Sequence, residues 1–322
     1  ITFVVIQFVP GGPVEQLMAE ARAGQGEGGS YKAGRDSDAK QIAELKKLYG
    51  FDKPAPVRYV EMLSNFARFD LGRSFLHNKD VWELIKEKLP VSISLGLWAF
   101  LLTYLISIPL GIAKAVREGS RFDTATTLVV LIGFAIPGFV LGVFLIVLFA
   151  GGSFWEIFPL RGLTSDNWEQ LSWPARIADY FWHLTLPMIC YVIGGFATVT
   201  LLTKNTFIEE LRKQYVLVAR AKGLSQDRVL WKHVFRNALI PLVTGFPAAF
   251  VFAFFGGSLL IETLFSLDGL GLLSYESIVR RDYPVVLGSL FLFTLIGLVV
   301  KLVSDLLYVV VDRRVQFGSV AK

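Results

Sequence analysis

Long uninterrupted runs of apolar residues alternate with polar loops along this chain. The runs occupy approximately Leu89–Ala113, Thr124–Phe154, Tyr180–Thr203, Asn237–Ile261 and Tyr283–Val300, and the last resumes beyond two charged residues and continues to Val311. About 20 apolar residues cross a bilayer core, so each run is long enough to span it. Backbone groups in hydrocarbon must form hydrogen bonds within their own segment, which predicts helices. The pattern therefore predicts five complete transmembrane helices and an all-α fold.

A shorter apolar run, Ile1–Val9, opens the chain and is followed by Pro-Gly-Gly-Pro. It is too short to span a membrane and lacks the basic start of a signal peptide. We expect it to be the end of a truncated first transmembrane helix, which gives six helices in total. An interfacial or re-entrant segment is the alternative.

Prolines interrupt several of the predicted helices and are expected to kink them, because proline removes a helix hydrogen bond. These prolines are Pro109, Pro137, Pro187 and Pro247. The stretch Gly133-Phe-Ala-Ile-Pro-Gly138 breaks the third span most strongly. A hinge for alternating access and a static kink are both consistent with it.

The composition agrees with a membrane location, and the charge pattern predicts an orientation. Of the 322 residues, 53% are hydrophobic and 18% are charged, whereas soluble domains carry about 25% charge. The net charge of +5 comes from basic residues gathered in a few loops, which favours a topology signal over nucleic-acid binding. The basic loops 114–121 and 204–236 and the tail at Arg313 and Arg314 are predicted to be cytoplasmic. Both termini are then cytoplasmic, and the loops 155–179 and 262–282 face outward.

Neither a disulfide nor a metal site is expected. Cys190 is the only cysteine and lies within an apolar run, where a thiol usually serves packing. The three histidines, His77, His183 and His233, are scattered and have no ligand spacing with Cys190. The glycine-rich stretch Gly24–Gly34 is expected to be a flexible insertion.

The loop at 204–236 is too long for a simple turn, and its pattern predicts two short helices. One face of the first predicted helix carries Phe207, Leu211, Tyr215 and Val218. Gly223 stands where a helix C-cap is expected, and Ser225 is placed to cap the start of the second helix. Two short helices joined at a glycine can lie flat against a partner protein.

The residues around this glycine are suited to docking. Ala219 and Ala221 are small beside Gly223, which allows a partner to approach the backbone closely, while Arg220 and Lys222 add charge around the contact. The alternative is an ordinary basic loop that only sets topology or touches anionic lipid.

Two stretches of this loop resemble the coupling loop of permeases in binding-protein-dependent ABC importers of the peptide group. They are Tyr215-Val-Leu-Val-Ala-Arg-Ala-Lys-Gly223 and Trp231-Lys-His-Val-Phe-Arg-Asn-Ala-Leu239. Further matching stretches are Tyr49–Pro54, Phe69–Ser74, Leu89–Pro90, Leu264–Gly271 and Arg281–Val285. The stretches Pro159–Gly162, Leu202–Asn205 and Gly257–Glu262 resemble the B-type permeases of Yej-type importers, which are associated with peptides and the peptide antibiotic microcin C.

The resemblance implies a type I importer permease with six transmembrane helices, located in the inner membrane of a bacterium. It implies a heterodimer with a second permease, two cytoplasmic ATPases that hold ATP and Mg, and a periplasmic solute-binding protein that delivers peptide. This chain would bind no cofactor of its own. The predicted organisation is the end of the first helix at 1–9, a periplasmic region at 10–88, and the permease core at 89–322 with its coupling loop at 204–236.

The resemblance also assigns the coupling role to particular positions. The residues expected to contact an ATPase are Tyr215, Ala219, Arg220, Ala221, Lys222 and Gly223. The broader family motif has a glutamate and two alanines ahead of its glycine, whereas this chain has Leu217, Val218 and Ala219, and many permeases have proline where it has Arg236. Carrying over that glutamate is therefore not justified. The matched positions are Ala219, Ala221 and Gly223.

A second set of residues is a candidate for the substrate path or gate. Its members are Glu262, Asp268, Gly269, Gly271 and Asp305. Glu262 and Asp268, with Arg280, Arg281 and Asp282, are placed to form an outer mouth, although solvated loop charges explain them equally well. The stretch Leu267–Leu272 resembles a re-entrant turn that packs over the pore in this family.

Lys301 and Asp305 lie four residues apart on one face of the sixth predicted helix. Each charge would cost roughly 2.5–3.5 kcal/mol if it stood unpaired in the membrane. We expect the two side chains to neutralise each other at a helix or subunit interface. A place on the translocation path is the alternative.

These features favour a primary-active permease that performs no chemistry itself. The sequence has no Gly-x-x-x-x-Gly-Lys-Ser/Thr phosphate loop, as expected of a subunit driven by another chain. A stand-alone secondary transporter or channel is the main alternative, but it leaves the basic two-helix loop without a purpose. An intramembrane enzyme would need a zinc motif, a nucleophile elbow or paired aspartates, and the spans contain none of these.

Overall fold

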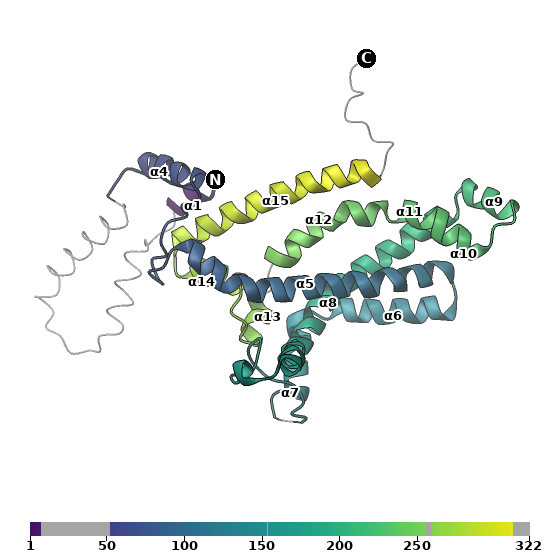
Figure 1. The fold of residues 1–322 in the computed structure, drawn as a ribbon, viewed down its shortest axis with the longest axis horizontal. Helices are drawn as coiled ribbons and strands as arrows, with labels where there is room; N and C mark the ends of the chain where they lie inside the picture. The colour runs from purple at the N-terminus through teal and green to yellow at the C-terminus, as the bar shows by residue number, and fades with distance from the viewer. Residues whose placement is uncertain (8–51, 153, 256–258, 312–322) are drawn as a thin grey trace, which may run out of the picture. The chain divides into compact units, whose positions relative to one another are not determined.

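The computed structural model describes residues 1–7, 52–152, 154–255 and 259–311, and it is all-α in these ranges (Figure 1). The only β pairing among them is an isolated bridge between Arg73 and Asp80. The helices in chain order are α1 (Thr2–Gln7), α4 (Ala55–Ala67), α5 (Val81–Val116), α6 (Arg121–Ala135), α7 (Gly138–Phe149), η1 (Trp168–Gln170), α8 (Trp173–Leu211), α9 (Gln214–Ala221), α10 (Gln226–Val229), η2 (Leu230–Val234), α11 (Phe235–Ala238), α12 (Ile240–Phe255), α13 (Leu259–Leu264), α14 (Leu270–Val279) and α15 (Tyr283–Val311). The Gly24–Gly34 insertion, Tyr49, Gly257, Arg313 and Arg314 lie outside the described residues.

Among the described residues, three helices are long and apolar enough to cross a membrane. They are α5, α8 and α15, and two bent pairs raise the number to five if each pair is one span. The pairs are α6 with α7, bent by 92°, and Gln226–Ala238 with α12, bent by 48°. The predicted all-α membrane fold is therefore confirmed. Helix α1 is too short to span, as the sequence indicated.

The third predicted span, Thr124–Phe154, consists of two helices, α6 and α7. Helix α6 ends at Ala135, Ile136 is extended, and α7 begins after Pro137. A β-carbon on Gly138 would lie 2.7 Å from the Cys190 carbonyl oxygen, so glycine lets α7 begin against the backbone of α8. The break predicted at Gly133–Gly138 is thus present, and a hinge there stays a prediction.

By its contacts the chain divides into two compact units, Ile1–Lys88 with Leu273–Leu295 and Leu89–Leu272 with Ile296–Lys322. In the first unit, the fully buried Asp282 accepts hydrogen bonds from the Ser74 hydroxyl and, at 3.0 Å, from the Phe75 amide. The Phe66 and Phe291 rings also pack at 4.9 Å. Asp282 therefore fastens the segment before α5 to the start of α15, which corrects its expected place in a solvated mouth.

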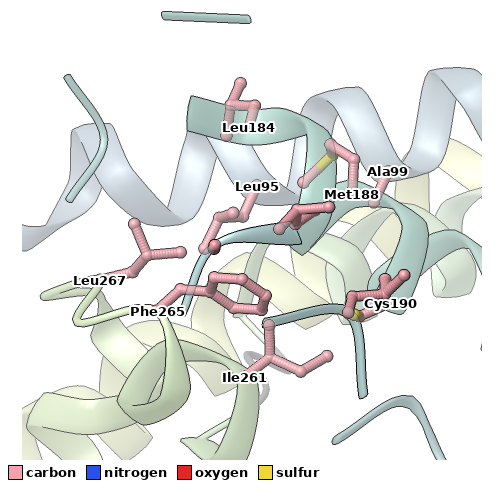
Figure 2. Packing of buried hydrophobic residues seen from close by; sticks show 11 residues of the cluster. Leu95, Ala99, Leu184, Met188, Cys190, Ile261, Phe265 and Leu267 are labelled. Atoms are coloured by element: carbon pink, nitrogen blue, oxygen red, sulfur yellow. The ribbon is translucent and has the colours of Figure 1, made fainter. Parts of the chain in front are cut away.

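The second unit has two separate apolar clusters. The first joins α5, α7, α8 and α13 through residues that include Leu95, Cys190, Ile261 and Phe265 (Figure 2). The second joins the last turns of α5 and α8 to α9, η2 and α11. We call the part around the second cluster the coupling-loop end and the part around the first the opposite end.

Candidate functional site

The loop between α8 and α12 is ordered, and its first helix is broken where the sequence suggested a continuous one. Helix α8 ends at Leu211, and α9 starts at Gln214 after Arg212 and Lys213. The helical register therefore restarts. Phe207 is buried but Val218 is 53% exposed, so the predicted single face from Phe207 to Val218 was wrong.

The predicted caps of this loop are confirmed. Gly223 has φ = +78°, the left-handed conformation that glycine adopts without strain, and its amide donates to the Arg220 carbonyl at 2.9 Å. Ser225 then caps α10, and its hydroxyl accepts a hydrogen bond of 3.4 Å from the Arg228 amide. The two-helix arrangement thus follows from local sequence signals.

One face of α9 is fastened to the rest of the chain. Val216 and Ala219 are buried in the second cluster beside Phe207. The Tyr215 hydroxyl donates to Glu210 Oε2 at 2.8 Å and accepts from Asn237 Nδ2 at 3.3 Å. Burial raises the pKa of the Tyr215 phenol, which keeps the donating proton in place. Helix α9 is therefore tied to the end of α8 and to α11.

The other face of α9 is open. Leu217 is 59% exposed, and the neighbouring polar and small side chains are exposed as well. We call this surface the coupling face, and its residues are Leu217, Val218, Arg220, Ala221 and Lys222. Ala219 is buried against the chain itself, so the expectation that it receives a partner directly was wrong. Gly223 lies at the edge of the face, and a β-carbon there would meet nothing within 4 Å.

A buried charge network lies at the same end, and the sequence analysis missed it. Lys114 is fully buried and its Nζ lies 3.1 Å from Asp123 Oδ1, while Lys204 Nζ donates to Asp123 Oδ2 at 2.8 Å. Lys114 also donates to the hydroxyls of Thr126 and Thr127 at 2.9 and 2.6 Å. One carboxylate therefore joins α5, α6 and α8. In the sequence Lys114 and Lys204 indicate only a topology signal, and nothing in the pattern connects them to Asp123.

At the opposite end, Glu262 is 1% exposed, so its expected place as an open mouth charge was wrong. Its Oε2 accepts the Leu272 amide at 2.8 Å. A β-carbon on Gly269 or Gly271 would lie 2.8 or 2.7 Å from the Glu262 carboxylate oxygens. The structure therefore brings these three predicted residues together, with Asp268 between them in the chain, as a turn wrapped around a carboxylate.

The expected ion pair between Lys301 and Asp305 is not formed. Both side chains are exposed on α15, and no salt bridge joins them. Ser304, between them, donates to the Thr244 carbonyl at 3.4 Å. Helix α15 turns Ser304 toward α12, and the exposed side chains of Lys301 and Asp305 lie on its outward side.

Together these features define a class: a polytopic helical membrane protein whose long loop forms two ordered helices fastened to the ends of its spans. The sequence profile of the family "Binding-protein-dependent transport system inner membrane component" matches residues 107–317. The chain belongs to this family, and it is an ABC-importer permease.

Relatives match nearly the whole chain. The chain is 54% identical to the peptidoglycan transport system permease protein YejB of Agrobacterium fabrum and 52% identical to the inner membrane ABC transporter permease protein YejB of Escherichia coli O157:H7. It is 34% identical to the oligopeptide transport system permease protein AppB of Bacillus subtilis. Each comparison covers 98% of this chain and 93% of the relative.

A solved structure shares the fold. It shows inward-facing conformations of the MetNI methionine ABC transporter, and its matched chain has a TM-score of 0.53 at 17% identity. The match covers 72% of this chain and 98% of that chain. At this identity it supports the fold of the type I importer permeases.

Proposed function

We propose that this chain forms, with a second permease, the path by which peptides cross the bacterial inner membrane, and that two ATPases drive it through the coupling face. The observation that carries the proposal is the asymmetry of α9. One side of this short helix is buried against the chain, while the other presents Leu217 and Val218 with basic residues around them. Apolar residues in such an exposed position suit a protein contact.

The contacts of α9 supply a route for transmitting force. Tyr215 ties it to Glu210 in the last turn of α8, and Val216 packs in the second cluster with Phe207. Asp123 then joins the ends of α5, α6 and α8 through Lys114 and Lys204. A displacement of α9 would therefore move the ends of three helices together.

In this proposal, the coupling loop and both termini are cytoplasmic, and a periplasmic solute-binding protein delivers substrate to the opposite end. The distribution of basic residues supports this orientation. ATP and Mg are bound by the partner ATPases, and this chain contributes no catalytic group. The second permease completes a heterodimer.

Peptides are the proposed substrate class because relatives over almost the full length are named oligopeptide and di/tripeptide permeases. Microcin C-like peptides are included through the Yej-type resemblance. Peptidoglycan fragments are a second candidate, since the relative with 54% identity is named a peptidoglycan transport permease. Both candidates contain peptide groups, so one path can serve both.

The coupling face is tested by co-purification of the ATPases with tagged chain from membranes. Leu217→Asp places a charge in the proposed contact and is expected to remove most of the bound ATPase. Leu217→Met keeps an apolar side chain of similar volume and is expected to retain it. Equal ATPase recovery with both variants would show that α9 does not form the contact.

The substrate is tested by uptake into proteoliposomes that contain both permeases, the ATPases and the binding protein. A labelled tripeptide and a labelled peptidoglycan peptide are compared with and without ATP. ATP-dependent uptake of either one identifies the substrate class. Uptake of neither, from an assembly that still hydrolyses ATP, would contradict peptide import.

A further inference from the structure

A groove at the coupling-loop end lies between the last turns of α5 and the segment formed by η2 and α11 (Figure 1). Its volume is about 460 Å³, and pockets that hold small ligands typically measure about 300–1,000 Å³. The α5 side runs from Ile108 to Arg117, and Leu230, Trp231 and Phe235 form the other side. Arg117 is the only charged residue among the described residues that line the groove, so its interior suits an apolar molecule.

The groove crosses the boundary that the sequence predicts for the membrane. Its α5 side begins inside the apolar run that ends at Ala113, whereas Arg117 belongs to the basic loop 114–121 that is predicted to be cytoplasmic. A cytoplasmic protein such as an ATPase does not reach side chains that lie inside the bilayer. A molecule that fills the whole groove must therefore come from the membrane.

Arg117 stands at the polar end of this groove, and its guanidinium group is available to a ligand. The group lies 5.1 Å from the centre of the Phe122 ring, which positions it beside the start of α6. It forms no ion pair within the described ranges, because the neighbouring Glu118 pairs with Arg212 instead. A guanidinium binds phosphate oxygens through two parallel N–H groups. Arg117 is therefore suited to hold the phosphate of a molecule whose apolar part fills the groove.

Trp231 brings a second donor to the groove. Its side chain is 56% exposed, and its ring packs on Phe235 with the ring centroids 5.1 Å apart. The indole N–H donates to no part of the chain that the structure describes. Tryptophan is enriched where the hydrocarbon core of a membrane meets the headgroups, because its ring is apolar and its N–H is polar. The free N–H of Trp231 can thus donate to an oxygen of a lipid headgroup.

The basic residues at this end fall into two groups. The first group forms ion pairs within the chain, and its members are Lys114, Lys204, Arg212 and Lys213. The second group has no acidic partner among the described residues, and it includes Arg117, Arg228 and Lys232. Arg228 precedes Trp231 by one turn, Lys232 follows it directly, and Asp227 is the only acid in 224–239. The positive charge around the apolar groove complements an anionic headgroup.

We propose that the groove binds an acyl chain of an anionic phospholipid whose phosphate is held by Arg117 and Trp231. The lipid packs against α5 on one side and against η2 and α11 on the other, next to the coupling loop. A neutral phospholipid has the same acyl chains, but its own cation offsets the phosphate, so it gains less from unpaired basic residues. This site goes beyond the proposed transport function and shares with it only the orientation of the chain.

Photo-labelling with lipids tests the site in bilayers that contain the chain assembled with its second permease and the ATPases. Phosphatidylglycerol and phosphatidylcholine probes carry the same diazirine group on the acyl chain, and each is added as a trace to bilayers of one composition. Mass spectrometry locates the adducts on peptides that cover 108–117 and 230–235. We expect about fivefold more labelling by the phosphatidylglycerol probe, the ratio that one basic residue near an anionic headgroup provides.

Three variants show whether the lipid occupies the groove as described. Arg117→Gln is expected to lower labelling by phosphatidylglycerol to the level of phosphatidylcholine. Arg121→Gln is the matched control, because it removes an exposed charge from the same predicted loop without lining the groove, and it should keep the preference. Ala113→Trp fills the groove with a bulky side chain and is expected to lower labelling by both probes. Co-purification of the ATPases with each variant checks that the assembly is intact.

Equal labelling of the groove by the two lipids, or a preference that survives Arg117→Gln, would overturn the proposal. A label that is present in the chain alone and is lost when the second permease is added would show instead that the groove is a contact between subunits. Labelling requires neither substrate nor ATP hydrolysis. Failure of the lipid site therefore leaves the proposed peptide import standing, and failure of peptide import leaves the lipid site standing.

Discussion

Asp123 and Glu262 are two buried carboxylates that the protein accommodates in different ways. Asp123, at the coupling-loop end, lies between the ammonium groups of Lys114 and Lys204. Glu262, at the opposite end, accepts a backbone amide and is enclosed by Gly269 and Gly271. The first joins three helices through ion pairs, whereas the second accepts hydrogen bonds from its own turn and from the side chain of Tyr191 on α8.

The difference shows how the helices and turns at each end are held in place. Ion pairs between separate helices fix those helices to one another, which suits the end where α9 would transmit a displacement. A carboxylate bound to its own turn leaves the turn dependent on close glycine packing and on the Gly162–Phe265 hydrogen bond. At that end, close packing and single hydrogen bonds position the turn, and a small change can break each of them.

The largest expected difference comes from the same isosteric change at both carboxylates. Asp123→Asn leaves two lysines without a counter-charge, one of them fully buried, and should cost about 3–5 kcal/mol of unfolding free energy. Glu262→Gln keeps an oxygen that can accept the Leu272 amide and should cost about 1 kcal/mol. Unfolding in mixed micelles measures both. Glu118→Gln, which removes an exposed ion pair with Arg212, is the control and should change stability by at most about 1 kcal/mol. Equal losses of unfolding free energy with Asp123→Asn and Glu262→Gln would show that the two carboxylates are accommodated in the same way.

The next contrast separates packing from docking within α9. Val216→Ala removes fully buried methyl groups and should cost about 1.5–3 kcal/mol. Val218→Ala changes an exposed side chain and should alter stability by less than about 0.5 kcal/mol, while it weakens binding of the ATPase. Thermal unfolding and ATPase co-purification are measured on both variants. If Val218→Ala destabilises the chain as much as Val216→Ala, then α9 is not oriented as described.

A glycine substitution tests the turn around Glu262. Gly271→Ala forces its β-carbon against the bound carboxylate, 2.7 Å away, and should cost about 1–3 kcal/mol. Gly245→Ala, inside α12, meets nothing within 4 Å and should be neutral or slightly stabilising. Unfolding of the two variants under identical conditions gives the comparison. An unchanged unfolding free energy with Gly271→Ala would mean that the Glu262 carboxylate does not fill this turn.

The smallest expected effect concerns Lys301 and Asp305. Because these side chains do not pair in the chain, the unfolding costs of Lys301→Met and Asp305→Leu should add in the double variant to within about 0.5 kcal/mol. A double-mutant cycle on the isolated permease measures this. A larger coupling energy would show that Lys301 and Asp305 form the ion pair that the sequence suggested.

The sequence predicted the elements that depend on local rules. The lengths of the apolar runs predict the spans, and Pro137 with its neighbouring glycines predicts the break between α6 and α7. Gly223 and Ser225 predict the two helices of the loop. Each of these follows from residues that are close together in the chain. The resemblance to peptide-type permeases supplied the family.

The sequence could not predict which side chains meet across helices. Asp123 is 81 residues from Lys204, and their ion pair depends on how α6 packs against α8. Glu262 and Asp282 carry charge between apolar spans, so they resembled mouth residues, and only the folded backbone provides the amides that bury them. The register of α9 depends on the stop at Arg212, for which the pattern holds no signal. The domain boundaries and the roles of the coupling residues stay predictions.

Site-directed photo-cross-linking shows whether the exposed side of α9 contacts an ATPase. Val218→Cys carries the cross-linker on the coupling face, and Trp173→Cys carries it at an exposed site at the start of α8. Cys190 is buried and does not compete for the label. We expect the labelled Val218→Cys variant to capture the ATPase in assembled membranes and the labelled Trp173→Cys variant not to capture it. Capture by both variants or by neither would contradict the coupling face.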